Sequence, residues 1–218
     1  MLARAALALL LATPVVAHAE GKPVTGKGYF TGCDAEGDPI YCYIGAVGFS
    51  YAVAEDGASA PGLFDALSAL PLMGAVSFEG QVEDTGETSS DLVLTKLAPV
   101  AGDPFEAGLR ALQGDWRSAD GSQQISVIGL DWLTYKDGEM SDSYQITPGT
   151  ACADGADQGG MVLSLRRYEA GTVEDACWKI KAADDGHLVV QDVKGPAGEV
   201  TYTRILEDEA APEGDAGN

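Results

Sequence analysis

The 218-residue sequence predicts an all-β protein with one or two short helices. Two observations predict this class. Short stretches of alternating apolar and polar residues are separated by turn-forming pairs such as Asp-Gly, Gly-Gly and Pro-Gly. Helical spacing of apolar residues is found at residues 63–70, and one further short helix is expected at residues 106–112. A third observation, four cysteines that fall into one pair in each half of the chain, predicts two separately folded units.

The first 19 residues predict a signal peptide. Arg4 gives a positive start, residues 5–12 form an apolar run, and Ala17-His18-Ala19 is the small-x-small pattern that signal peptidase recognises. We therefore expect cleavage after Ala19 and a periplasmic or secreted protein. The apolar run is too short to span a bilayer, so we expect no membrane insertion.

The cysteines are expected to form disulfides, because an exported chain meets an oxidising compartment. Their spacing favours Cys33 with Cys42 and Cys152 with Cys177, although four cysteines allow three pairings. No Cys-x-x-Cys motif is present, so the thiols do not predict a metal site.

Residues 20–100 predict the first unit, with three strands, a helix and two further strands. The helix begins near Pro61 and places Leu63, Phe64, Leu67 and Leu70 on one face. The strands are expected at residues 28–31, 40–44, 49–53, 75–82 and 92–97.

This order of elements resembles the OB-fold, and residues 70–82 resemble the segment that enters the fourth strand of such barrels. The resemblance implies a five-stranded OB-like barrel. Many OB-folds bind nucleic acid through basic grooves. Residues 20–100 carry three lysines against twelve acidic residues, and the whole chain has a formal net charge of −21. Such a surface repels phosphate, so no nucleic-acid partner is expected.

After a linker at residues 101–105, residues 106–206 predict the second unit, an up-and-down barrel of about eight strands. Residues 106–112 are expected to form a short helix that plugs one end. The strands are expected near Trp116 and at residues 124–128, 132–135, 144–147, 161–168, 177–182, 188–192 and 200–205, with Pro148-Gly149 among the turns between them. The acidic residues 207–218 should form a disordered tail.

The second unit resembles lipocalin-like (calycin) barrels, because Gly114-Asp115-Trp116 matches the Gly-x-Trp start of their first strand and Arg204 lies in the last strand. The resemblance implies a structural pair in which the Arg204 guanidinium stacks on the Trp116 indole. The unit also resembles, more weakly, the bacterial inhibitors of secreted metalloproteases. Those inhibitors insert a free N-terminal segment into the protease, whereas here another unit precedes the barrel.

Aromatic residues of the second unit form the candidate ligand site. Trp132, Tyr144, Trp178 and Tyr202 lie on different predicted strands, and alternate residues of a barrel strand point inward. These side chains either fill a solid core or line a small apolar pocket.

No catalytic residue, metal site or cofactor is predicted. After removal of the leader, His187 is the only histidine, and no Gly-x-Ser-x-Gly motif accompanies it. Asp34, Glu36 and Asp38 alternate like the start of a calcium loop, but the rest of that loop is absent, which favours a solvated turn. We therefore expect an exported, non-catalytic protein that binds an unknown protein or small molecule. The alternatives are a carrier of a small apolar ligand in the second barrel and a periplasmic protease inhibitor.

Overall fold

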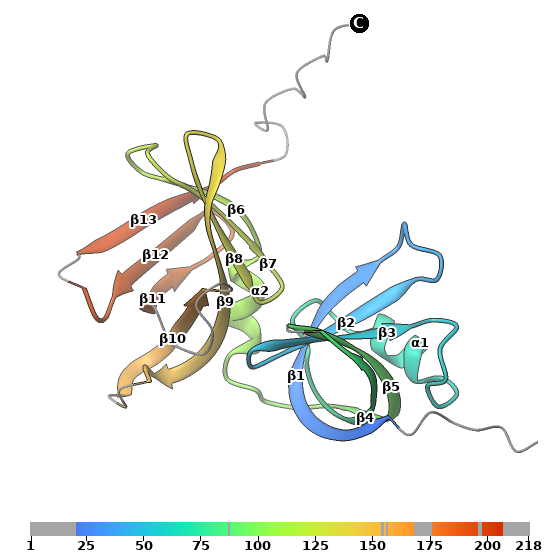
Figure 1. Ribbon diagram of the computed structural model, residues 1–218. Coiled ribbons are helices and arrows are strands. Elements are labelled where there is room, and N and C mark those ends of the chain that lie inside the picture. Colours follow the sequence, from blue (N-terminus) through green and yellow to red (C-terminus); the bar gives the residue numbers. More distant parts are fainter. Residues whose placement is uncertain are drawn as a thin grey trace, which may run out of the picture.

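The computed structural model describes residues 21–86, 88–153, 155, 157–167, 176–195 and 198–206. The predicted signal peptide, Tyr168 and the predicted tail lie outside these residues. The structure confirms the all-β class: a closed five-stranded barrel is followed by a closed eight-stranded barrel (Figure 1).

The first barrel contains five strands and one helix, in the order that the sequence predicts. The elements are β1 (Lys22–Asp34), β2 (Tyr41–Ala46), β3 (Phe49–Ala54), α1 (Leu63–Ser68), β4 (Ala75–Thr85) and β5 (Ser89–Pro99). The strands close in the order β1-β2-β3-β5-β4, and β4 pairs back onto β1. The β3–β5 pairing is the parallel one. This topology is compatible with an OB-like barrel.

The core of the first barrel forms because one face of each strand is apolar. Ile44, Val53 and Leu94 point inward from three strands and are fully buried. Leu67 of α1 packs onto them and covers one end of the barrel. A disulfide joins Cys33 and Cys42, which are directly paired on β1 and β2.

The second barrel is an antiparallel meander in which each strand pairs with the next. The elements are α2 (Glu106–Leu112), β6 (Gly114–Ser118), β7 (Gln124–Ile128), β8 (Asp131–Lys136), β9 (Glu139–Ala151), β10 (Asp157–Arg167), β11 (Ala176–Ala183), β12 (His187–Asp192) and β13 (Glu199–Arg204). Pairing of β13 with β6 closes the barrel. The second disulfide joins Cys152 and Cys177. This architecture is compatible with a lipocalin-like fold.

The predicted turn at Pro148-Gly149 is wrong, and the Gly159-Gly160 pair, also expected to form a turn, lies inside β10. Pro148-Gly149 was expected to end a strand, but β9 continues to Ala151, and these residues pair with Leu163 and Val162 of β10. Pairing between β8 and β9 stops at Gln145. Pro148 therefore lies where β9 has a neighbour on one side only, which is a position where strands tolerate proline.

The two helices are six and seven residues long, and no helix in the described part of the chain has the length and hydropathy of a membrane span.

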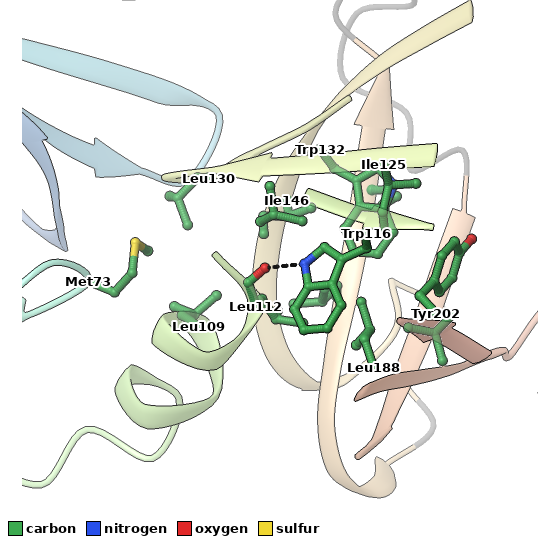
Figure 2. Packing of buried hydrophobic residues seen from close by; sticks show 14 residues of the cluster. Met73, Leu109, Leu112, Trp116, Ile125, Leu130, Trp132, Ile146, Leu188 and Tyr202 are labelled. Atoms are coloured by element: carbon green, nitrogen blue, oxygen red, sulfur yellow. Dashed lines mark hydrogen bonds between the residues drawn. The ribbon is translucent and has the colours of Figure 1, made fainter. Parts of the chain in front are cut away.

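Helix α2 plugs one end of the second barrel and is held there by the first and last strands. Leu109 and Leu112 are fully buried, and the Trp116 indole N–H donates a hydrogen bond to the Leu112 carbonyl at 2.8 Å (Figure 2). The Arg204 guanidinium carbon lies 4.1 Å from the centre of the Trp116 ring. Arg204 also donates to the carbonyls of Ala111, at 3.0 Å, and Gln113.

We expect Arg204→Ala to lower the free energy of unfolding by about 2–3 kcal/mol, because it removes a cation–π contact and leaves carbonyls at the end of α2 without a charged donor. Arg204→Lys keeps the charge but not the planar fork, and it should recover less than half of this loss. Urea unfolding followed by near-ultraviolet circular dichroism measures both. Arg117→Ala, an exposed arginine on β6, is the control. An equal loss of stability in Arg117→Ala would contradict the stabilising role given to Arg204.

Candidate binding sites at the barrel junction

The two barrels are joined by a continuous apolar cluster. Met73, in the segment between α1 and β4, is fully buried against the cluster that contains Leu109 and Leu130 of the second barrel. Tyr29 of β1 packs against the same cluster. In Figure 2, Met73 lies beside α2 and Leu130, on the side where the first barrel meets the second. The junction is therefore part of the protein core.

Polar contacts fix the connection between the barrels. The Tyr29 hydroxyl donates to Asp103 Oδ1 at 3.2 Å, and the same oxygen accepts the backbone N–H groups of Phe105 and Glu106 at the start of α2. Arg110 of α2 donates to the Leu72 carbonyl at 3.0 Å. Burial, and then the Asp103 carboxylate, raise the pKa of Tyr29. Residues 101–105 thus form a packed connection.

Close backbone approaches show how tightly the barrels fit. A Cβ on Gly45 of β2 would lie 2.9 Å from a Leu130 methyl group. Gly48, with φ of +77° in the β2–β3 turn, faces the Arg166 guanidinium, where a Cβ would lie 2.6 Å from a nitrogen. Arg166 in turn donates to Gln145 at 2.6 Å. A larger side chain at Gly45 would force Leu130 and Thr31 to shift, whereas the flexible Arg166 side chain can move away from Gly48.

A groove runs from the outer face of the first barrel to the junction. It consists of two adjoining hollows of about 400 and 380 Å³ that share Tyr43 and Ser89. We call it the junction groove; its lining residues are Thr31, Tyr41, Tyr43, Gly45, Phe49, Ser50, Ala52, Gly86, Thr88, Ser89, Ser90, Asp91, Ile128, Gly129, Leu130, Asp131 and Gln145. Ile128, on its far wall, is 59% exposed.

The outer part of the junction groove combines two tyrosines with one carboxylate. Tyr41 and Tyr43 are two residues apart on β2 and so lie on the same face of the sheet. Ala52 pairs with Tyr43 on one side and with Asp91 on the other, and its small side chain leaves the hollow open. Burial is the main cause that raises the pKa of Tyr43, followed by the nearby charges of Asp34 and Asp91. The local field therefore favours a cationic group.

A smaller hollow of about 200 Å³ borders the same junction. Its lining is largely apolar and includes Tyr29, Val76, Phe105 and Pro148. Val47, at its edge, is 75% exposed.

The aromatic residues predicted as a ligand site do not all meet. Trp132 and Tyr202 are almost completely buried. Trp132 and Trp178 are in edge-to-face contact, with ring centres 4.7 Å apart, and Tyr144 is paired with Trp132 across β8 and β9. The Tyr202 hydroxyl instead donates a hydrogen bond to Gln123 Oε1 at 2.8 Å. Burial raises the pKa of Tyr202 to about 12.

Trp132 has one unusual feature. Its indole nitrogen is buried and has no hydrogen-bond partner among the described residues. Nearby, Arg167 donates to the Tyr144 hydroxyl at 2.9 Å and forms an ion pair with Asp142.

The other candidate residues lie in turns or at the strand ends beside them. Asp184 Oδ1 accepts the backbone N–H groups of Gly186 and His187, which lowers the pKa of Asp184, and the His187 side chain is 67% exposed. Asp34 accepts the backbone N–H of Glu36. No cluster of three or more potential metal ligands occurs among the described residues.

Sequence reasoning missed the junction groove. Tyr41 and Tyr43 were recognised as strand residues, but their position opposite β5 depends on the parallel β3–β5 pairing that closes the barrel. The i, i+2 spacing of two tyrosines beside acidic turns was the one available signal.

Comparisons with known proteins identify no family. No protein-family model matches the chain, and no curated protein matches it. Among solved structures, the chain is similar to a Leishmania major protein described as an aspartyl-tRNA synthetase, at 14% identity and a TM-score of 0.28. The match covers 44% of this chain and 21% of that one. A TM-score this low supports no conclusion about fold or function.

We expect Tyr29→Phe to lower the free energy of unfolding by about 1 kcal/mol at neutral pH, through loss of the bond to Asp103. The raised pKa means that the folded protein favours the neutral phenol, so this stabilisation is complete below the ordinary value of 10.0 and declines as the pH rises above it. The stability difference between wild type and variant should therefore shrink between about pH 8 and about pH 11. Urea unfolding of wild type and variant at these two pH values measures the difference. A difference that stays constant would contradict the hydrogen bond between Tyr29 and Asp103.

Proposed function

We propose that this is an exported, non-catalytic binding protein that holds an extended basic segment of a partner protein in the junction groove. The observation that carries the proposal is that the two hollows share Tyr43 and Ser89 and together extend from Tyr41 to the exposed Ile128 at the junction. A strand-like peptide can lie along such a groove and contact both barrels.

The chemistry of the groove favours a cationic partner. A lysine or arginine side chain can stack on the Tyr41 or Tyr43 ring and lie close to the Asp91 carboxylate. The formal net charge of −21 would attract a basic partner over a longer range. The same charge disfavours nucleic acid, the usual ligand of OB-like barrels.

Export is part of this proposal. The predicted signal peptide supports it, and the two disulfides are consistent with an oxidising compartment. The OB-like and lipocalin-like descriptions of the barrels are supported by strand order, by the position of α1 and by the contact between Trp116 and Arg204.

The protease-inhibitor alternative has less support. In this chain, the segment that precedes the second barrel is α2, whose Leu109 and Leu112 are buried and whose Arg110 binds the first barrel. A segment held in this way is not free to enter a protease cleft.

The proposal predicts that a labelled Lys-Gly repeat peptide binds and that its affinity falls as salt is added. Tyr43→Ala and Asp91→Asn should each weaken binding about three- to tenfold, because each removes about 1 kcal/mol of contact with a cation. Fluorescence anisotropy measures these changes.

Asp115→Asn is the matched control, because it changes the net charge equally at an exposed strand position of the second barrel. It should leave peptide affinity within about twofold of wild type. Equal weakening by Asp91→Asn and Asp115→Asn, or equally tight binding of a Glu-Gly repeat peptide, would refute the proposal.

A second candidate is carriage of a small ligand in the second barrel. The unpaired Trp132 indole N–H beside Trp178 supports it, because a ligand acceptor could satisfy that donor. Native mass spectrometry of protein purified from its own periplasm should then detect a bound small molecule. The added mass of this molecule should be absent from Trp132→Phe. Absence of any added mass on the wild type would remove this candidate.

A further inference from the structure

At its second end, the first barrel is not covered by a helix of the described residues. Helix α1 follows β3 and precedes β4, so it covers the end where β3 stops and β4 starts. A hollow of about 200 Å³ lies at the opposite end, where β1, β3 and β5 begin and β4 finishes. We call it the barrel-mouth cavity; it is lined by Lys22, Pro23, Val24, Phe49, Tyr51, Val82 and Ser90.

An aromatic wall leads from this cavity into the core. The ring centres of Phe49 and Tyr51 are 5.0 Å apart, and those of Tyr51 and the buried Phe78 are 5.1 Å apart in an edge-to-face arrangement. Val24 and Val82 add aliphatic surface and pack against the same core cluster. Burial raises the pKa of Tyr51. Most of the lining is therefore apolar.

A single buried hydroxyl interrupts this apolar lining. Ser89 and Asp91 of β5 are exposed, whereas Ser90, Leu92 and Leu94 are buried, so the Ser90 side chain points into the barrel. Ser90 is 4% exposed, and its Oγ has no hydrogen-bond partner among the described residues. An unpaired buried hydroxyl is unfavourable, and a ligand oxygen in the cavity would satisfy it.

We propose that the barrel-mouth cavity binds a neutral molecule with one aromatic ring and one hydroxyl group, that is, a simple phenol. The size fits, because an engineered apolar cavity of about 150 Å³ binds benzene. The ring would contact Phe49 and Tyr51, and its hydroxyl would pair with Ser90 Oγ. Lys22 is the one charged residue of the lining and is exposed, so the aromatic and aliphatic walls favour a neutral ring.

This site adjoins the groove proposed for a basic partner, and Phe49 and Ser90 line both, but the two proposals rest on different side chains. Ser90 points to the inside of β5, while Ser89 and Asp91 of the groove point outward. Each proposal can therefore fail without the other.

Titration of the ¹⁵N-labelled full chain with phenol and with toluene tests the proposal. Toluene has the same shape but no hydroxyl. In the wild type, phenol should shift the amide signals of Lys22, Val24, Ser90 and residues 49–51, and it should bind about three- to tenfold more tightly than toluene. In Ser90→Ala, this preference should disappear. Val82→Phe should fill the cavity and abolish binding of both.

Ser89→Ala is the matched control, because it removes the neighbouring, outward-facing hydroxyl and should keep the preference. Three results would overturn the proposal: no shift at millimolar phenol, a preference for phenol that survives in Ser90→Ala, or shifts centred on Trp132 and Trp178. If Val82→Phe does not fold, the comparison of Ser90→Ala with Ser89→Ala decides alone.

Discussion

The packing of α2 between the barrels is the interaction on which the rest of the structure depends. Its apolar side supplies Leu109 and Leu112 to the end of the second barrel, and its first turn is bound by Asp103, which also holds Tyr29. Arg204 binds the carbonyls at its other end. One short helix, too short to be stable alone, thus connects the first strand of one barrel to the last strand of the other.

This arrangement gives the junction groove fixed walls. One wall is formed by β2, β3 and β5 of the first barrel, and the other by the β7–β8 turn and β9. Linkers between domains usually permit relative motion. Here buried apolar contacts and hydrogen bonds restrain it, so a partner that spans both walls would bind without a large loss of conformational entropy.

Much of the fold could be predicted from the sequence, because it depends on local patterns. Alternation located the strands, and the nearness of each cysteine to its partner favoured the disulfides that the structure contains. The short helix expected at residues 106–112 is present. Pro148-Gly149 was misassigned because its place in a one-sided part of β9 depends on where β8 begins, which is a non-local property.

The candidate sites were less predictable for the same reason. The grouping of Tyr43 with Asp91, and of Ser90 with Phe49, is produced by barrel closure between strands far apart in sequence. Likewise, the alternation of residues along a strand predicts which aromatic side chains point inward. It does not predict whether such a side chain fills a solid core or lines a cavity. Trp132 and Tyr202 are both inward and buried, yet only Tyr202 has a partner for its polar atom among the described residues.

The disulfides and the packing divide the chain differently. Each disulfide lies within one barrel, so the covalent cross-links define two modules. Helix α2, which plugs the second barrel, and the connection before it are, however, hydrogen-bonded to Tyr29 and Leu72 of the first barrel. A descendant gene that inherited the second barrel alone would encode a plug without its anchors, and one that inherited the first barrel alone would expose Met73. The two modules are therefore expected to be inherited, duplicated and lost together.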